Sequence, residues 1–75
     1  MKADAQLDTK GLVCPMPVVK TTLKMEELKP GQILEVLATD EGIKQDMPAW
    51  CKSTGNEFLG LEEELGIIKV YVKKV

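Results

Sequence analysis

The stretch GLVCPMP, residues 11–17 of this 75-residue chain, decides how the fold begins. Proline is tolerated in the first turn of a helix, because the backbone N–H that it lacks would have no helical partner there. The two prolines of this stretch therefore predict a helix entrance. Before it, Ala5 to Asp8 is a candidate strand closed by a turn at residues 9–11. After it, we expect a helix from Pro15 to about Leu28.

Apolar residues recur at helical spacing in this first helix. Val18, Met25 and Leu28 lie on one face of it, and Val19 and Leu23 widen that face. We therefore expect these five side chains to be buried, and the charged residues between them to face solvent.

The remainder of the chain alternates between strand and helix patterns. Strand-forming residues run from Ile33 to Thr39, and two further strands, Glu57 to Glu64 and Ile67 to Lys74, are joined by a tight turn. A second helix between them ends at Gly55. The front strand, helix and strand require a right-handed parallel crossover, and the closing hairpin is antiparallel. The fold class is thus α/β (α+β): a mixed four-stranded sheet with both helices on one face.

The sequence allows two starting points for the second helix. Asp46 and Pro48 suit an N-cap followed by proline in the first turn. Alternatively, one apolar stripe begins at Ile43 and continues through Met47 and Cys51 at helical spacing. Both alternatives place Cys51 on the apolar stripe, so we expect this thiol to be buried in the core.

Charge and composition argue against several classes of function. Ten lysines, no arginine and twelve acidic residues give a net charge of −2, so the chain lacks the basic surface and guanidinium groups that follow a phosphate backbone. We expect no direct nucleic-acid partner. Histidine is absent, which removes the usual general base and the commonest metal ligand. We expect neither a metal nor a cofactor.

Cysteine usage and hydropathy predict the compartment. Two cysteines are too few for a disulfide-linked secreted scaffold, and they lack the paired spacing of a zinc site. The most apolar run, residues 11–19, is too short to span a bilayer and is interrupted by two prolines. The sequence therefore predicts one cytoplasmic domain over residues 1–75, with no transmembrane segment.

Cys14 is the strongest candidate for chemistry. At a helix entrance, unpaired backbone amides and the positive end of the helix dipole favour a thiolate. Lys10, just before the flexible Gly11, adds a second positive charge near the thiol. A lone cysteine is more often a small buried hydrophobe. The double-proline entrance favours an exposed, reactive thiol instead.

Three segments of the chain resemble the TusA/SirA-like family of small sulfur-carrier proteins. They are Leu7-Asp8 followed by GLVCPMPV at residues 11–18, then Asp46-Met47-Pro48, and finally Gly55-Asn56-Glu57. The resemblance implies a two-layer sandwich with the order βαβαββ, similar to the C-terminal domain of translation initiation factor three.

The resemblance also implies a function as a sulfur carrier or sulfurtransferase. Cys14 would accept a persulfide sulfur from a donor protein, such as a cysteine desulfurase or a rhodanese-like enzyme, and pass it to an acceptor protein. Such a relay needs an exposed thiol of low pKa and no histidine. Similar proteins serve tRNA thiolation, sulfur oxidation, molybdenum-cofactor supply or thiosulfate use, and the residues here do not select among these pathways. The residues expected around the bound partner are Lys10, Gly11, Pro15, Met16, Pro17 and Lys20.

Two other functions fit parts of the sequence. A non-catalytic regulatory or protein-binding module would use the helix-free face of the sheet, where Ile33, Leu37 and Tyr71 are expected to be partly exposed. A thiol-disulfide oxidoreductase would pair Cys14 with Cys51, although a resolving cysteine normally lies close to the reactive one.

Overall fold

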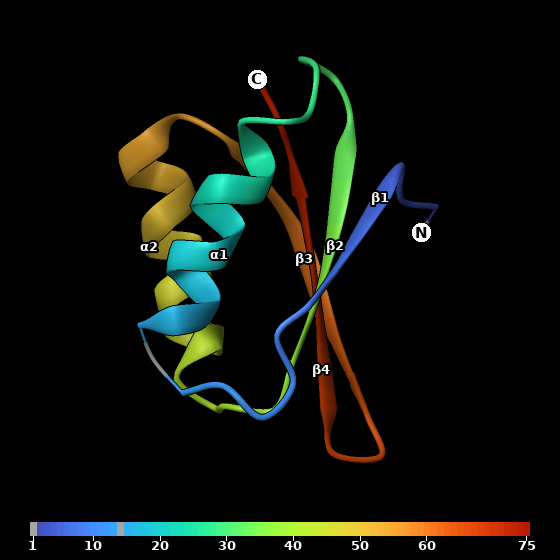
Figure 1. The fold of residues 1–75 in the computed structure, drawn as a ribbon, viewed down its shortest axis with the longest axis vertical. Coiled ribbons are helices and arrows are strands. Elements are labelled where there is room, and N and C mark those ends of the chain that lie inside the picture. Colours follow the sequence, from blue (N-terminus) through green and yellow to red (C-terminus); the bar gives the residue numbers. More distant parts are fainter. Residues whose placement is uncertain (1, 14) are drawn as a thin grey trace.

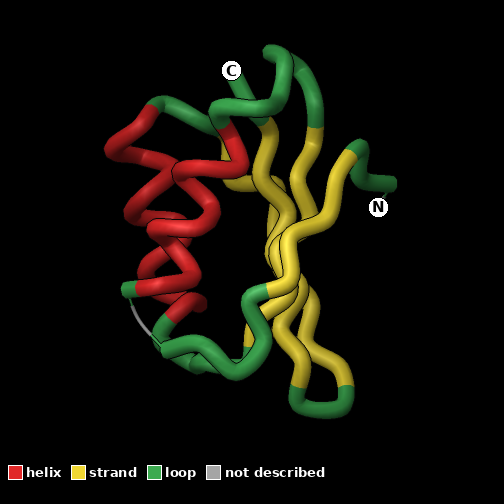
Figure 2. Tube along the Cα trace, viewed as in Figure 1, coloured by secondary structure: helices red, strands yellow, loops and turns green. Residues whose placement is uncertain are grey.

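Four strands form one mixed sheet, and both helices lie against the same face of it (Figures 1 and 2). The computed structural model describes residues 2–13 and 15–75. The strand order is β1-β2-β4-β3, with β1 parallel to β2 and the other pairs antiparallel. The predicted fold class and element order are therefore confirmed. The elements are β1 (Ala5–Asp8), α1 (Met16–Met25), β2 (Ile33–Ala38), α2 (Ile43–Thr54), β3 (Glu57–Glu64) and β4 (Ile67–Lys73).

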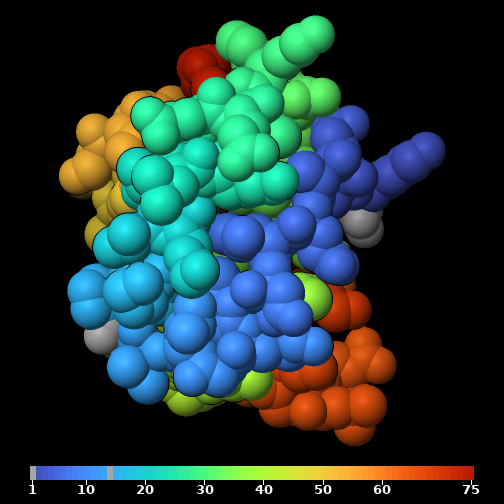
Figure 3. Space-filling model, in the orientation of Figure 1, coloured from blue at the N-terminus to red at the C-terminus, as the bar shows by residue number. Residues whose placement is uncertain are grey.

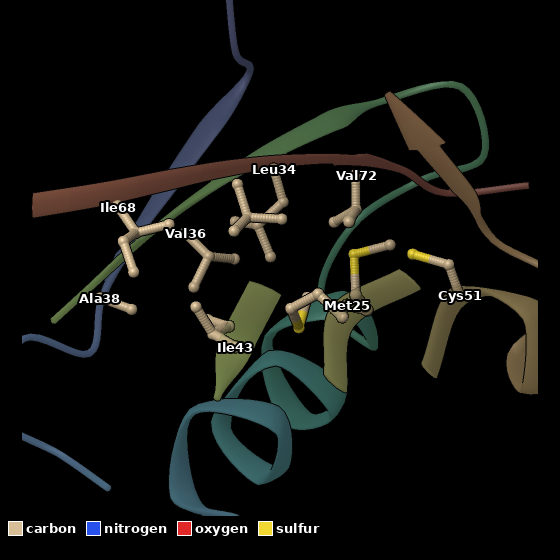
Figure 4. Packing of buried hydrophobic residues seen from close by; sticks show 10 residues of the cluster. Met25, Leu34, Val36, Ala38, Ile43, Cys51, Ile68 and Val72 are labelled. Carbon is tan, nitrogen blue, oxygen red and sulfur yellow. The ribbon is translucent and has the colours of Figure 1, made fainter. Parts of the chain in front are cut away.

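The core lies between the sheet and the two helices. Alternate residues of β2 and β4 point into it and have no exposed surface, because successive side chains of a strand face opposite sides of the sheet. The helices contribute Met25 from α1 and three residues from α2 (Figure 4). The buried apolar residues of this core are Met25, Leu34, Val36, Ala38, Ile43, Met47, Cys51, Ile68, Val70 and Val72.

The buried face of α1 differs from the predicted one. Pro17, Thr21 and Met25 are buried, whereas Val19 and Leu23 are exposed, so the prediction for these two residues was wrong. A polar residue occupies the centre of the buried face because the Thr21 hydroxyl donates to the Pro17 carbonyl at 2.7 Å and stays satisfied. The helix also ends at Met25, three residues earlier than predicted.

Of the two starting points predicted for α2, the earlier one is confirmed. The helix begins at Ile43 and its N-cap is Gly42, so Asp46 is not the N-cap and Pro48 lies inside the helix. Burial of the Ile43 side chain ties this first turn to the core. The predicted end is confirmed, because Gly55 adopts a left-handed conformation with φ of 81° that favours glycine.

The closing hairpin was predicted within one residue. Its turn, Leu65-Gly66, has positive φ at both residues, as a two-residue hairpin turn requires. The two hairpin strands pair antiparallel, with a bulge between Phe58 and Gly60 on β3. Across the described residues, no helix is both long and apolar enough to cross a membrane.

Candidate functional site

The loop that leads to the candidate site is held at the end of the two parallel strands. The Thr9 backbone N–H and hydroxyl both donate to the Leu37 carbonyl, at 2.7 and 2.5 Å. Two residues further on, the Gly11 N–H donates to the Thr39 hydroxyl at 3.0 Å. Thr9 is fully buried, so this side chain fixes the loop rather than contacting a partner.

Sequence reasoning missed both threonines. Each follows the last residue of a strand, since β1 ends at Asp8 and β2 at Ala38. Parallel strands end at the same edge of a sheet, so the two positions are neighbours. That signal was available once the parallel crossover had been predicted.

Lys10 is exposed but not free of partners. Its backbone N–H donates to Asp8 Oδ1 at 2.9 Å, and its Nζ lies 3.8 Å from Asp8 Oδ2. The acid therefore offsets part of the positive charge that was predicted to act on the thiol. The adjacent Gly11 has φ of 83°, a conformation that strains any residue with a side chain.

The two prolines frame the entrance of α1. Pro15 is the N-cap and Pro17 lies in the first turn, with its side chain buried. Cys14, the predicted nucleophile, lies outside the described residues. The Met16 N–H donates to the Val13 carbonyl at 2.9 Å. Lys20 lies one turn further along α1 and is exposed.

A shallow groove opens beside this entrance, between α1 and α2. It has a volume of about 370 Å³ and a mostly apolar lining that includes Pro15, Val18 and Trp50. The indole N–H of Trp50, which lines the groove, donates to the Thr22 hydroxyl of α1 at 2.9 Å and so links the two helices. No sequence pattern pointed to this groove, because it depends on how the helices pack.

The second thiol, that of Cys51, is expected to be unreactive. Cys51 is 2% exposed within the core, and burial raises its pKa to about 11. A thiol with this pKa is almost wholly protonated at neutral pH and is a poor nucleophile. The prediction of a buried Cys51 is confirmed, and an oxidoreductase that uses it as the resolving cysteine is disfavoured.

The helix-free face of the sheet is less apolar than expected. Tyr71 is only 4% exposed, so the prediction of a partly exposed ring there was wrong. Its hydroxyl donates to Glu35 Oε2 at 2.7 Å, and the Gln6 amide donates to Glu35 Oε1 at 2.6 Å. These bonds lower the pKa of Glu35. Ile33 and Leu37 remain half-buried.

Comparisons with known proteins identify the fold and the family together. The family model described as Sulfurtransferase TusA matches residues 5–74. A Bacillus subtilis protein named as a sulfur carrier, YrkI, is 53% identical over 74 residues, covering 99% of each chain. YrkF of the same organism is also 53% identical, but this chain spans only 40% of its length.

More distant relatives agree with this match. The sulfur carrier protein TusA of Allochromatium vinosum is 39% identical over 71 residues, which are 95% of this chain and 93% of that one. A crystal structure of a SirA-like protein from Desulfitobacterium hafniense superposes with a TM-score of 0.75 at 28% identity, covering 92% and 95% of the two chains. Because the family match spans nearly every residue of this small sandwich, helix entrance included, the chain belongs to the TusA family of sulfur carriers.

Proposed function

We propose that this chain relays sulfur as a persulfide on Cys14. In the loading step the Cys14 thiolate attacks the outer sulfur of a donor persulfide, R–S–SH. The new S–S bond forms on Cys14 as the donor S–S bond breaks, and the donor leaves as the thiolate R–S⁻. The reverse chemistry passes the sulfur to an acceptor thiolate. The transfer consumes no oxidant, reductant or metal.

The proposal rests on the difference between the surroundings expected for Cys14 and those of Cys51. Cys14 directly precedes Pro15, the N-cap of α1, where the positive end of a helix dipole stabilises a thiolate. The other thiol, Cys51, is buried and has a pKa raised to about 11. The chain thus offers one nucleophile suited to the family's chemistry, and that nucleophile needs no histidine.

The remaining site residues have supporting roles in the proposal. Gly11, held by Thr39, and the buried Pro17 shape the loop and the first turn. Pro15, Met16, Lys10 and Lys20 are exposed around the entrance and are expected to contact the protein partner.

The proposed partners are a sulfur-donor protein, of the cysteine desulfurase or rhodanese class, and a sulfur-acceptor protein. Their transfer chemistry requires a free thiol on the carrier, which the reducing cytoplasm maintains. Transfer to a tRNA-modifying, sulfur-oxidising, cofactor-building or thiosulfate-using acceptor is equally compatible with the site.

Mass spectrometry of the intact protein tests the proposal. After incubation with a cysteine desulfurase and cysteine, or with a rhodanese and thiosulfate, the protein should gain the mass of one sulfur atom. A reducing thiol should remove it. Cys14→Ser should gain nothing, since a hydroxyl cannot carry a persulfide, whereas Cys51→Ala should load like the unchanged protein. Loading that survives in Cys14→Ser would overturn the assignment.

A further inference from the structure

The side of α1 that faces away from the sheet is unusually apolar. Val13, Met16, Val19 and Leu23 are 69%, 41%, 43% and 58% exposed. The last three recur at i, i+3 and i+7 and so form one stripe along the helix. An exposed apolar stripe of this kind is typical of a surface that a partner covers.

Positive charge accompanies the stripe. Residues 10–25 contain three lysines and no acidic residue, although the whole chain has a net charge of −2. Lys20 forms no ion pair with any described residue, and Lys24 approaches only Glu27, at 3.5 Å. We call Val13, Met16, Val19, Leu23, Lys20 and Lys24 the α1 outer face.

A small depression lies beside the C-terminal half of this face. A shallow groove of about 190 Å³ is lined by Leu7, Lys20, Leu23, Lys24 and Glu27. Figure 3 shows residues 15–25, in light blue to teal, on the visible surface of the molecule. The groove combines two leucines with two ammonium groups and the single carboxylate of Glu27, so its net charge is positive and a partner's carboxylate next to an apolar side chain would fit it.

We propose that the α1 outer face is the docking surface for the sulfur-donor protein, and that the donor contacts it with an apolar patch bordered by Asp or Glu. This inference rests on the proposed function. The face begins at the entrance of α1, so a protein seated on it would hold its persulfide near Cys14. Opposite charges would steer the encounter and the apolar contact would hold the complex.

A second copy of this chain fits the face less well. Two copies meeting through it would bring two sets of lysines together, because Glu27, the acidic residue of the groove, already lies 3.5 Å from Lys24 of its own chain. Like charges at an interface disfavour association. The charge pattern therefore favours an acidic partner over self-association.

Rates of Cys14 loading, measured by intact mass, test this docking surface. The donor is a rhodanese with thiosulfate or a cysteine desulfurase with cysteine, whichever loads the unchanged protein faster. We expect Lys20→Glu to slow loading about tenfold at low ionic strength, through lost steering. Leu23→Ala should slow it by a similar factor through lost apolar contact. Salt should slow the unchanged protein but have little effect on Lys20→Glu.

Matched controls keep the effect specific to the face. Lys52→Glu makes the same charge change as Lys20→Glu, but on an exposed residue of α2. Leu65→Ala makes the same truncation as Leu23→Ala, but at a residue of the hairpin turn that is 94% exposed. Both should load at the unchanged rate. Inorganic polysulfide provides a second arm, because it delivers sulfur to Cys14 without a protein surface. All four variants should load from polysulfide within about threefold of the unchanged protein, since exposed charges act weakly at a distance in salt.

Other outcomes would contradict either the docking surface or the proposed function. Unchanged donor loading in Lys20→Glu and Leu23→Ala overturns the docking surface. The docking surface is also overturned if polysulfide loads the protein but neither protein donor does. It is overturned as well if sedimentation shows that the protein is a dimer and that Leu23→Ala abolishes this dimer. If Cys14 is loaded by neither polysulfide nor protein donors, the proposed function itself fails.

Discussion

At the scale of single residues, we expect the two cysteines to differ in reactivity. Burial raises the pKa of Cys51 to about 11, whereas Cys14 precedes the N-cap of a helix. Helix N-termini lower thiol pKa values. We therefore expect the thiol of Cys14 to be more acidic than the thiol of Cys51.

The first prediction concerns the pKa of Cys14. We expect it to lie below the ordinary thiol value of about 8.5, because the helix dipole favours the thiolate. Iodoacetamide alkylation rates across pH 5 to 10, measured in Cys51→Ala so that one thiol is present, give this pKa directly. A value at or above 8.5 would mean that activation comes from the donor and not from the fold.

Thr39 supports the second prediction. Its hydroxyl accepts the Gly11 N–H at 3.0 Å and so ties the loop to the end of β2. Thr39→Val keeps the shape but loses this acceptor, which should cost about 1 kcal/mol of unfolding free energy and slow polysulfide loading of Cys14 by loosening the loop. Thr39→Ser restores the hydroxyl and should restore the loading rate. Equal rates in Thr39→Val and the unchanged protein would show that the bond does not position the site.

At the scale of elements, α1 is fastened at its far end by a residue outside the helix. Lys74, which follows β4, donates from Nζ to the Met25 and Leu28 carbonyls at 2.6 and 2.7 Å. Met25 is the last residue of α1, where a positive charge is favourable, and Leu28 lies in the turn that follows the helix. The contact joins the last strand to the helix that presents the candidate site.

The third prediction tests this attachment. Lys74→Met should lower the free energy of unfolding by about 1 to 2 kcal/mol, because two carbonyls lose a charged donor. Lys29→Met, at an exposed lysine with no side-chain partner among the described residues, is the control and should change stability by less than about 0.5 kcal/mol. Urea denaturation measures both. Similar midpoints in the two variants would contradict the attachment.

At the scale of the whole molecule, one small core holds the site in shape. Two helices and one face of the sheet share ten buried apolar residues. At this chain length the core is thin, so ionising a buried group affects the stability of the entire fold. Cys51 is such a group, since it lies on α2 within that core.

The fourth prediction is a loss of stability at alkaline pH. The folded-state pKa of Cys51, about 11, exceeds the ordinary pKa of an exposed thiol. Its contribution to stability is therefore complete below pH 9 and falls as the pH rises toward 11, because only the unfolded thiol ionises in that range. Tyr71, with a pKa of about 12, acts at higher pH.

Comparison with Cys51→Ala isolates this effect. The variant should be about 1 kcal/mol less stable at pH 7, yet its stability should decline less than that of the unchanged protein between pH 8 and 10. Urea denaturation at several pH values measures the difference. Parallel declines in the two proteins would show that Cys51 does not titrate with unfolding.

The sequence by itself determined the elements, their order and the identity of the candidate nucleophile. Alternating apolar residues, a proline pair and glycine turns are local signals, and they predicted Ala5–Asp8, the end of α2 at Gly55 and the hairpin turn. The resemblance of three segments, residues 11–18 among them, added the prediction of a sulfur carrier, and the family match confirmed that role.

Only the tertiary structure decided how each helix is rotated about its axis and what the loops are tied to. Apolar residues lie on both sides of α1, so its periodicity did not reveal that Thr21 would face the core and Leu23 solvent. Packing against the sheet and α2 determines the rotation of α1 about its axis, through contacts between residues far apart in the chain. The burial of Tyr71 and the groove beside Pro15 depend on the same long-range contacts. A local pattern carries no information about such contacts, and therefore could not predict them.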